Sequence, residues 1–259
     1  MDEPVIANAV VQSATIWGRG NQDLAACTDL DVQVTMMPSA AEPPLAKFDR
    51  QNNVVFRDSN WCADSDPDCS DTALMITSVF ARTWGEIVDA DIEINSQHFN
   101  WGDLESTTAG GARHDLQNAL THEIGHLIGF DHTCWNGQTL PRPLDQFGVA
   151  VPRCDAAELS DEAHASTMFS SADPGDMTKR SLEGDDLQGV CDTYPRNAPN
   201  HLACAMPGEG GGGCAVGPGA SAAPGSGAPG TIGAASFAAF LATLLALLVW
   251  TGGRRAHLR

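Results

Sequence analysis

The segment His122–His132 reads HEIGHLIGFDH and constrains the chain more than any other stretch. Helical periodicity runs through DLQNALTHEIGHLIG, so the first two histidines are expected on a helix. His122 and His126 are four residues apart and therefore lie on one face, one turn above the other. Gly129 allows a sharp turn after this helix, because glycine tolerates a positive φ. The turn can bring His132 back toward the same point in space.

Three neutral imidazoles are a ligand set that suits zinc. They leave the fourth tetrahedral position open for water, which distinguishes a catalytic site from a closed structural one. Glu123 follows the first histidine, and its carboxylate can accept a proton from a water whose pKa the metal lowers to about 7. A single histidine is more often a solvated or core residue, whereas five matched positions have chance odds of order ~10⁻⁷. We therefore expect one catalytic zinc ion held by His122, His126 and His132, with Glu123 as general base.

This motif resembles that of the metzincin zinc proteases, whose HExxHxxGxxH pattern is matched by His122, Glu123, His126, Gly129 and His132. The resemblance implies a zinc-dependent endopeptidase that acts on polypeptide substrates. It also implies an α+β fold with a twisted mixed β-sheet, an active-site helix and a small C-terminal subdomain after the glycine. The resemblance covers roughly residues 5–195, and we assign residues 1–195 to the catalytic domain.

The Met-turn of this family, which lies beneath the metal, resembles Ser166–Phe169 (STMF) and would make Met168 the apolar floor of the site. Taken alone, Met168 would more often be an ordinary core residue. Ala90–Asn95 (ADIEIN) and Leu182–Pro195 (LEGDDLQGVCDTYP) resemble a strand and the last helix of the matrixin branch. Thr133 departs from the serine that matrixins usually carry, so the metzincin resemblance is closer than the matrixin one.

Periodicity along the rest of the chain predicts the other elements of an α+β domain. Apolar residues at steps of three and four predict a helix over residues 5–17, and residues 182–193 predict a final helix. Short β-like runs predict strands at residues 30–37, 53–57, 74–83 and 87–95. Matrixin sheets begin with a strand before the first helix, so the early start of this helix predicts that the first strand is missing.

The charge and the cysteine content indicate which partners and which cellular compartment to expect. The net charge of −19 would repel phosphate backbones, so nucleic acid is not expected as a partner. Eight cysteines are many for a reducing compartment and predict disulfides in an exported protein. Sequence alone does not fix their connectivity. We predict three local pairs, Cys62–Cys69, Cys134–Cys154 and Cys191–Cys204, which leave Cys27 and Cys214 without partners.

The composition changes after the predicted domain. Residues 196–231 are rich in Gly and Pro and predict a flexible linker. Residues 232–250 carry no charge, and a helix of that length, about 28 Å, matches a hydrocarbon core of about 30 Å. We predict a transmembrane segment there and a basic cytoplasmic tail over residues 251–259, with the acidic body outside. A buried helix of a soluble core is the alternative.

The Gly-rich stretch around Cys214 (GEGGGGCAVG), the apolar span and the terminal arginines resemble the MYXO-CTERM sorting tags of myxobacteria. In that family the tag is processed at its cysteine and the protein stays at the cell surface, which makes Cys214 the proposed sorting cysteine. A stray thiol or a disulfide partner is the alternative role. The chain opens MDEPVIANAVVQSA, which lacks the pattern of an export signal. We expect the true N-terminus to lie upstream and to supply the signal, the first strand and a partner for Cys27.

Several other sequence features could be functional, but each also has a simpler structural explanation. The acidic loop Asp58–Asp71 could bind calcium, although a solvated loop is favoured. Val151–Asp155 (VPRCD) resembles the cysteine switch of matrixin propeptides, but a disulfide to Cys134 is favoured because that switch precedes the catalytic domain. Residues 53–113 show no pattern for a second, structural zinc. The remaining histidines are expected to be solvated: His98, His114, His164, His201 and His257.

The sequence therefore favours a monomeric zinc endopeptidase that is exported and held at the cell surface or outer membrane by its C-terminal tag. The alternative is a non-catalytic, zinc-binding, disulfide-stapled surface adhesion module. Glu123 argues against that alternative, because a structural zinc site has no use for a general base. A third possibility is a truncated, inactive product whose sheet fails to assemble without its first strand.

Overall fold

The structure is a computed structural model that describes residues 1–37, 46–62, 70–83, 85–106, 112–137, 141–145 and 148–197, and the backbone of residues 255–258. The predicted linker and transmembrane segment lie outside these ranges, as does Cys214. Among the described residues, no helix is both long enough and apolar enough to cross a membrane.

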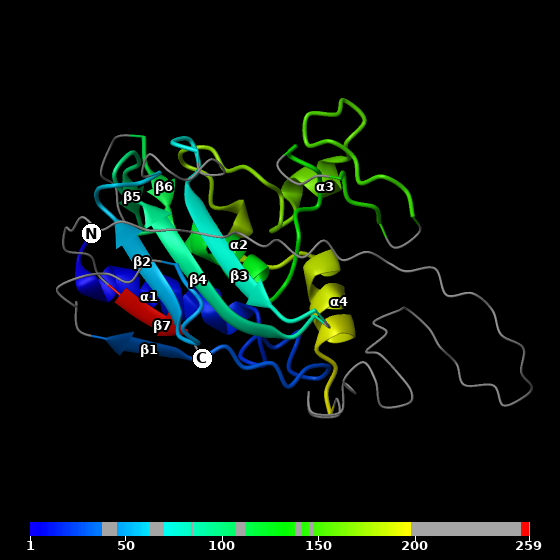
Figure 1. The fold of residues 1–259 in the computed structure, drawn as a ribbon, viewed down its shortest axis with the longest axis horizontal. Helices are drawn as coiled ribbons and strands as arrows, with labels where there is room; N and C mark the ends of the chain where they lie inside the picture. Colours follow the sequence, from blue (N-terminus) through cyan, green and yellow to red (C-terminus); the bar gives the residue numbers. More distant parts are fainter. Residues whose placement is uncertain are drawn as a thin grey trace, which may run out of the picture.

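The described chain is a mixed α+β domain, as the sequence predicts (Figure 1). The four strands and the two flanking helices predicted from periodicity are all present, with ends that differ by up to four residues. Its helices are α1 (Glu3–Ile16), α2 (Leu116–Leu127), α3 (Asp161–Ala165), the 3₁₀ helix η1 (Thr178–Arg180) and α4 (Gly184–Thr193). Its strands are β1 (Val34–Met37), β2 (Asn52–Arg57), β3 (Met75–Ala81), β4 (Ile87–Asn95), β5 (Trp101–Gly102), β6 (His114–Asp115) and β7 (Arg255–Leu258).

The main sheet is mixed and has the strand order β1-β7-β2-β4-β3. β2 runs parallel to β4, with Val54 opposite Ile92, whereas β3 runs antiparallel to β4, with Thr77 opposite Ile92. β3 therefore forms one edge of the sheet. The place between β1 and β2 is taken by β7, which pairs antiparallel with both. β7 belongs to the predicted basic tail, residues 251–259, so this part of the tail lies in the sheet of the domain. Helix α1 starts at Glu3, and the described residues before it are Met1 and Asp2.

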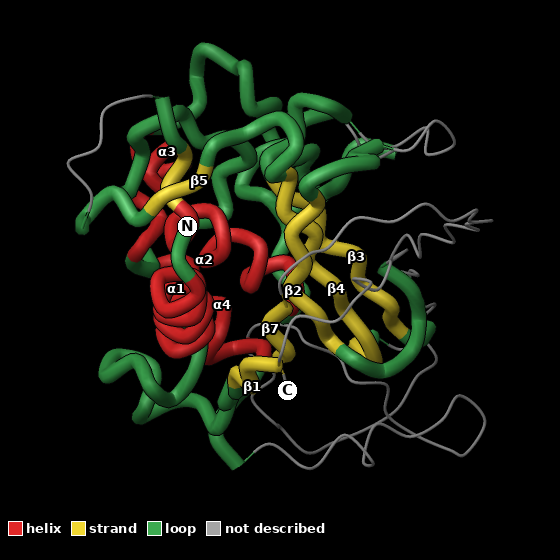
Figure 2. The backbone as a smooth tube through the Cα atoms, turned by 90° about the vertical axis from the view of Figure 1, so that its left-hand side faces the viewer, coloured by secondary structure: helices red, strands yellow, loops and turns green. Residues whose placement is uncertain are grey.

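Helices α1 and α2 lie together on one face of the main sheet (Figure 2). The helix-facing side of β4 supplies Ile92 and Ile94, which are fully buried. The buried side of α1 includes Val10. Trp17, the residue directly after α1, is also buried, and its indole donates a 2.7 Å hydrogen bond to the carbonyl of Thr121 in α2. The core thus fixes α2, which carries the histidine motif, against both the sheet and α1.

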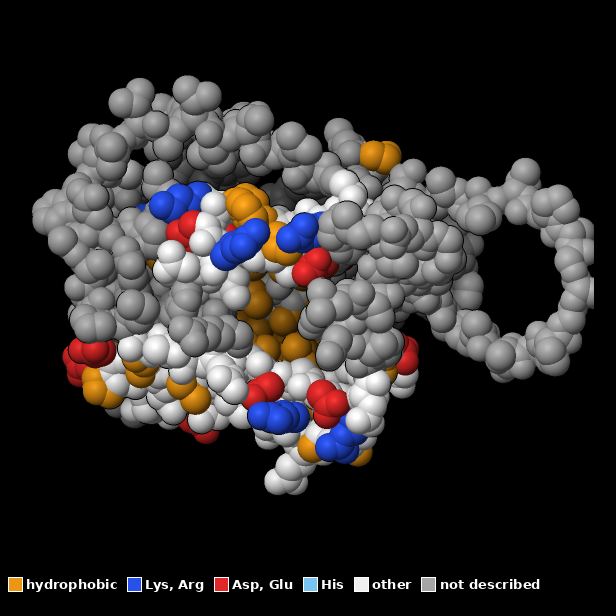
Figure 3. Space-filling model, turned by 60° about the horizontal axis from the view of Figure 1, so that its bottom comes forward, with side chains coloured by type: hydrophobic (Ala, Val, Ile, Leu, Met, Phe, Trp, Pro, Cys, Tyr) orange, Lys and Arg blue, Asp and Glu red, His pale blue; other side chains and the backbone are white. Residues whose placement is uncertain are grey.

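One view of the surface shows a hollow in this face of the molecule (Figure 3). Hydrophobic side chains line the floor of a hollow, and side chains of both charge signs lie around its rim (Figure 3). The described chain also has large exposed apolar side chains, and two of them, Leu144 and Val149, lie close together in the loop that follows the histidine motif.

The disulfides confirm one predicted pair and correct another. Cys134 and Cys154 are bonded, as predicted. The predicted Cys191–Cys204 pair is wrong, because Cys191 is bonded to Cys27, which the sequence left without a partner. Cys62 is also disulfide-bonded, whereas Cys69 and Cys204 lie outside the described residues.

Cys191 is bonded to Cys27 because the end of α4 lies against the segment that contains Cys27. The hydroxyl of Thr28 donates a 2.5 Å hydrogen bond to the carbonyl of Tyr194, and the Arg196 amide donates to the Cys27 carbonyl at 2.6 Å. The end of α4 is therefore attached to the segment that follows α1. These long-range contacts bring Cys27 and Cys191 together.

Removing this long-range disulfide is expected to cost more stability than removing the local one. Cys27 and Cys191 are 164 residues apart, against 20 residues for Cys134 and Cys154. In the chain-entropy account, the longer loop stabilises the fold by roughly 2 kcal/mol more. Urea unfolding of the two double Cys→Ala variants measures this difference. Equal losses of unfolding free energy would contradict the expectation.

Candidate metal centre

Helix α2 begins at a buried polar anchor. The side chain of Asp115, its N-cap, accepts a 2.8 Å hydrogen bond from the amide of Asn118. The same carboxylate accepts hydrogen bonds of 2.8 and 2.6 Å from the guanidinium of Arg180, which also binds Asp103 at 2.6 Å. These carboxylates raise the pKa of Arg180. The start of the motif helix is therefore held by a charge-assisted network.

The three motif histidines converge on one point. The Nε2 atoms of His122 and His126 are 3.1 Å apart, those of His126 and His132 are 3.1 Å apart, and those of His122 and His132 are 3.2 Å apart. This group could hold a metal ion. His122 is buried, and the other two rings are half-buried, so the site opens to solvent on one side.

The turn that returns the chain to the site is made at Gly129. Its φ of +96° lies in the left-handed region that favours glycine. The amide of Phe130 donates to the Gly125 carbonyl at 2.9 Å, which closes the end of α2. A Cβ at Gly129 would also lie 3.2 Å from Cδ1 of Ile87. The structure therefore supports the predicted role of this glycine in placing His132.

Backbone carbonyls hold two of the three rings from behind. The Nδ1 atom of His122 lies 2.8 Å from the carbonyl oxygen of Thr167, and that of His126 lies 2.7 Å from the carbonyl oxygen of Phe130. A carbonyl oxygen only accepts, so each Nδ1 carries the proton. The Nε2 lone pairs of these rings are then free and face the centre, as ligation requires.

Met168 is packed against α2. Its side chain is fully buried beneath α2, and a Cβ built on Gly125 would meet its Sδ atom at 2.3 Å. Its carbonyl accepts a 3.1 Å hydrogen bond from the amide of Thr133, directly after the third histidine. The turn at residues 166–169 therefore touches both the helix and the returning chain.

Glu123 lies beside the histidines with its side chain almost wholly buried. Its Oε2 atom accepts a 2.5 Å hydrogen bond from the hydroxyl of Thr77 in β3. Thr77 carries no signal in the sequence, since it is one of two adjacent polar residues in an otherwise apolar strand. Only the packing of β3 against α2 brings the two side chains together.

Lys179 is a second residue that the sequence analysis missed. Its side chain is buried, and its ammonium donates hydrogen bonds to the carbonyls of Phe169 and Ser171, the latter at 2.8 Å. Its amide donates to the Asn118 side chain in α2 at 2.7 Å. Burial lowers the pKa of Lys179 to about 8. This lysine thus joins the segment after Met168 to the motif helix.

Burial also determines the protonation state of His122 and His132. It lowers the pKa of His122 well below the usual value, and the neighbouring His126 and Lys179 lower it further. Burial and the neighbouring His126 lower the pKa of His132 to about 3. Both rings are therefore neutral at physiological pH, which is the form that binds a metal.

The remaining histidines agree only in part with the prediction that they are solvated. His98 and His164 are exposed, as predicted, but His114 is buried against Phe99 and Trp101, so its predicted solvation is wrong. Its short strand β6 pairs with β5, which carries it into the interior. His201 and the side chain of His257 lie outside the described residues.

Cys154 is disulfide-bonded, which excludes the cysteine-switch reading of its segment. Most of the acidic loop proposed for calcium, residues 63–69, lies outside the described residues, so calcium binding stays a prediction.

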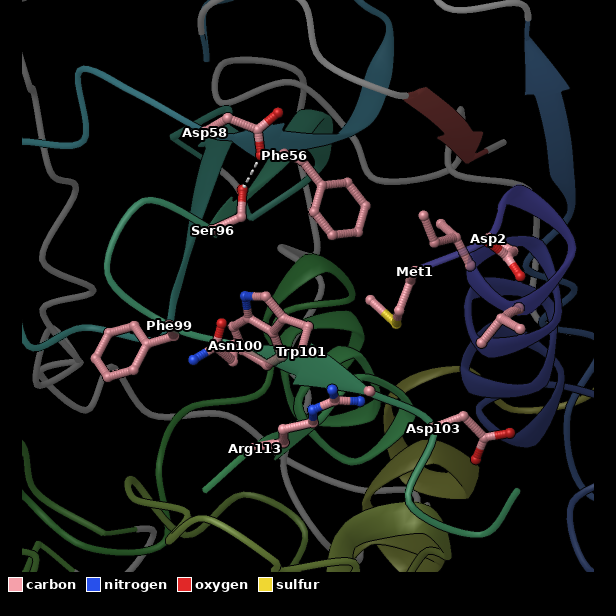
Figure 4. A pocket seen from close by; sticks show the side chains of 13 residues that line it. Met1, Asp2, Phe56, Asp58, Ser96, Phe99, Asn100, Trp101, Asp103 and Arg113 are labelled. Carbon is pink, nitrogen blue, oxygen red and sulfur yellow. Dashed lines mark hydrogen bonds between the residues drawn. The ribbon is translucent and has the colours of Figure 1, made fainter. Parts of the chain in front are cut away.

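A pocket of about 500 Å³ lies apart from the histidines, at the start of α1 (Figure 4). Phe56, Phe99 and Trp101 supply its aromatic lining, and Arg113 lies at its edge (Figure 4). None of the motif residues lines this pocket. Within the described residues, the group that could hold a metal ion is His122, His126 and His132.

No protein-family model matches this chain, and no curated protein matches its sequence. The metal centre is therefore defined by its own geometry: three converging imidazoles, two of them held by carbonyls, beside one buried carboxylate.

Substitution of Gly125 by alanine is expected to disturb the floor of the site. The added Cβ would lie 2.3 Å from Met168 Sδ and 2.8 Å from Trp17 Cζ2, so buried side chains must shift. Overpacking of this kind costs about 1–3 kcal/mol. Urea unfolding should show this loss, and chelator competition should show weaker metal binding. Gly184→Ala, where the Cβ meets nothing within 4 Å, is the matched control and should change neither.

The metal-free protein is expected to lose stability as the pH falls from about 6.5 toward 3. Unfolded histidines bind protons from about pH 6.5 downward, whereas folded His132 binds one only near its pKa of about 3. Between these values the unfolded state holds more protons and is favoured. Urea unfolding with chelator present, at several pH values, measures the effect. His132→Asn should show a shallower pH dependence than the unsubstituted chain, and identical slopes would contradict this account.

Proposed function

We propose that this protein is a zinc-dependent metalloendopeptidase of the metzincin type. The observation that carries the proposal is the triangle of Nε2 atoms, 3.1–3.2 Å on each side, next to the buried carboxylate of Glu123. Ligands at about 2.0–2.1 Å from a tetrahedral zinc lie about 3.3 Å apart, so the triangle fits this ion with small adjustments. Neutral nitrogen donors with an open fourth position also suit zinc.

In this proposal the chain supplies the base and the proton path. A zinc ion at the site would lower the pKa of a water and polarise a peptide carbonyl. Glu123 accepts the proton of the attacking water through its carboxylate and then passes it to the leaving amine nitrogen. The carbonyls of Thr167 and Phe130 keep two imidazoles in the tautomer that leaves Nε2 unprotonated.

The edge of the sheet offers a place for the substrate. β3 is the last strand of the sheet order, and Thr77 within it touches Glu123. An extended peptide can add to such an edge through backbone hydrogen bonds. A polypeptide paired with β3 would therefore run past the base, which supports cleavage within a chain.

The cellular setting remains part of the proposal. The Cys27–Cys191 and Cys134–Cys154 disulfides support an oxidising compartment outside the cytosol. Retention at the cell surface through the span at residues 232–250 and processing at Cys214 rest on the sorting-tag resemblance alone. The competing function, a non-catalytic adhesion module, predicts zinc binding without hydrolysis.

Replacing Glu123 separates binding from catalysis. In Glu123→Ala the three ligands stay in place, so the full-length chain in detergent should keep one zinc ion per molecule by emission spectroscopy. Loss of the general base should lower kcat at least ~100-fold on a quenched-peptide library. Glu162→Ala, at an exposed site in α3, is the control and should retain activity.

Hydrolysis by the unsubstituted chain should stop on chelation and return with added zinc. Zinc binding without hydrolysis in the unsubstituted chain would instead support the adhesion module, and unreduced hydrolysis by Glu123→Ala would overturn the assigned mechanism.

A further inference from the structure

Strand β3 carries a hydroxyl where packing requires only an apolar side chain. Met75, Thr77 and Val79 alternate along the strand and therefore share one face of it. Met75 belongs to the hydrophobic core, and its side chain is buried. Thr77 is half-buried and Val79 is exposed, so this face passes from the core to solvent at Thr77. A valine at position 77 would have nearly the same shape as threonine, and what the hydroxyl adds is a polar contact.

That hydroxyl is directed at the carboxylate of Glu123. Thr77 Oγ1 lies 2.5 Å from Oε2 of Glu123 and 3.3 Å from the Glu123 carbonyl oxygen. The shorter contact is a charge-assisted hydrogen bond at the strong end of the usual range. Among the described residues, no other hydrogen bond to this carboxylate is found.

We propose that Thr77 is a positioning residue for Glu123, and that its hydroxyl holds one carboxylate oxygen so that the other faces the attacking water. This inference rests on the proposed endopeptidase function. A glutamate side chain has three rotatable bonds, and most of its rotamers would turn the carboxylate away from the centre. The bond to Thr77 removes that freedom before substrate arrives, which is how a fixed geometry contributes to catalysis.

The hydrogen bond between Thr77 and Glu123 has a second consequence, because Thr77 lies in an edge strand of the sheet. Its backbone belongs to the edge strand that is proposed to pair with the substrate, while its side chain holds the base. One residue therefore sets the distance between the base and a peptide paired with β3.

The test compares two substitutions at the same position in the full-length chain. Thr77→Val keeps the shape and loses the hydroxyl, and loss of a hydrogen bond to a charged group should lower kcat roughly ten-fold or more, with KM unchanged. Thr77→Ser keeps the hydroxyl and should restore kcat to within about two-fold. Thr15→Val removes an exposed hydroxyl on α1, far along the chain from the site, and should leave kcat unchanged.

A readout without metal separates this inference from the proposed function. In a crystal structure of zinc-free Thr77→Val, the Glu123 carboxylate should leave its position or occupy several rotamers, while the three imidazoles stay in place. An unmoved carboxylate, or a kcat equal to that of the unsubstituted chain, would overturn the role of Thr77. If the unsubstituted chain binds zinc and hydrolyses no peptide, the endopeptidase proposal fails, and the crystal structure still decides whether Thr77 holds Glu123.

Discussion

The contact between the turn at residues 166–169 and helix α2 is the interaction on which the centre depends. The Thr167 carbonyl orients His122 at 2.8 Å, and Met168 fills the space left by Gly125. The Met168 carbonyl holds the amide of Thr133, one residue after His132. Helix α2 and the chain that follows it thus meet a turn that is distant in the sequence, and the three parts contact one buried side chain. Without this floor, the first and third ligands would have no fixed relation to each other.

Charged groups anchor this floor from below. Arg180 binds the N-cap carboxylate of Asp115, and the adjacent Lys179 binds the carbonyls that follow Met168. Burial of the charged Lys179 ammonium costs free energy, and this lowers the pKa of the side chain. Its positive charge also opposes protonation of His122 and His132. Lys179, which ties η1 to the motif helix, therefore adds to the effect of burial in keeping His122 and His132 neutral.

The sequence predicted the local features of the site and missed the distant ones. The spacing of His122, His126 and His132 encodes their convergence, because a helix turn and one glycine fix it within eleven residues. The Cys27–Cys191 bond depends on where α4 ends, which periodicity does not specify. Likewise, Thr77 and Lys179 act on residues 46 and 10 positions away, respectively, through contacts that only the tertiary packing creates.

The polar groups around the three imidazoles are arranged asymmetrically, and this asymmetry affects which reaction the site could support. The carbonyls of Thr167 and Phe130 stand behind the imidazoles, whereas the carboxylate of Glu123 lies on the side of β3. His126 and His132 are half-buried, so the side of the centre that they share is open to solvent. Under the proposed function, Glu123 acting as base on one flank and a peptide paired with β3 next to it would define a single direction of attack. A site that only stabilised the fold would need the three nitrogens, but it would gain nothing from a buried carboxylate held beside them by a strand hydroxyl.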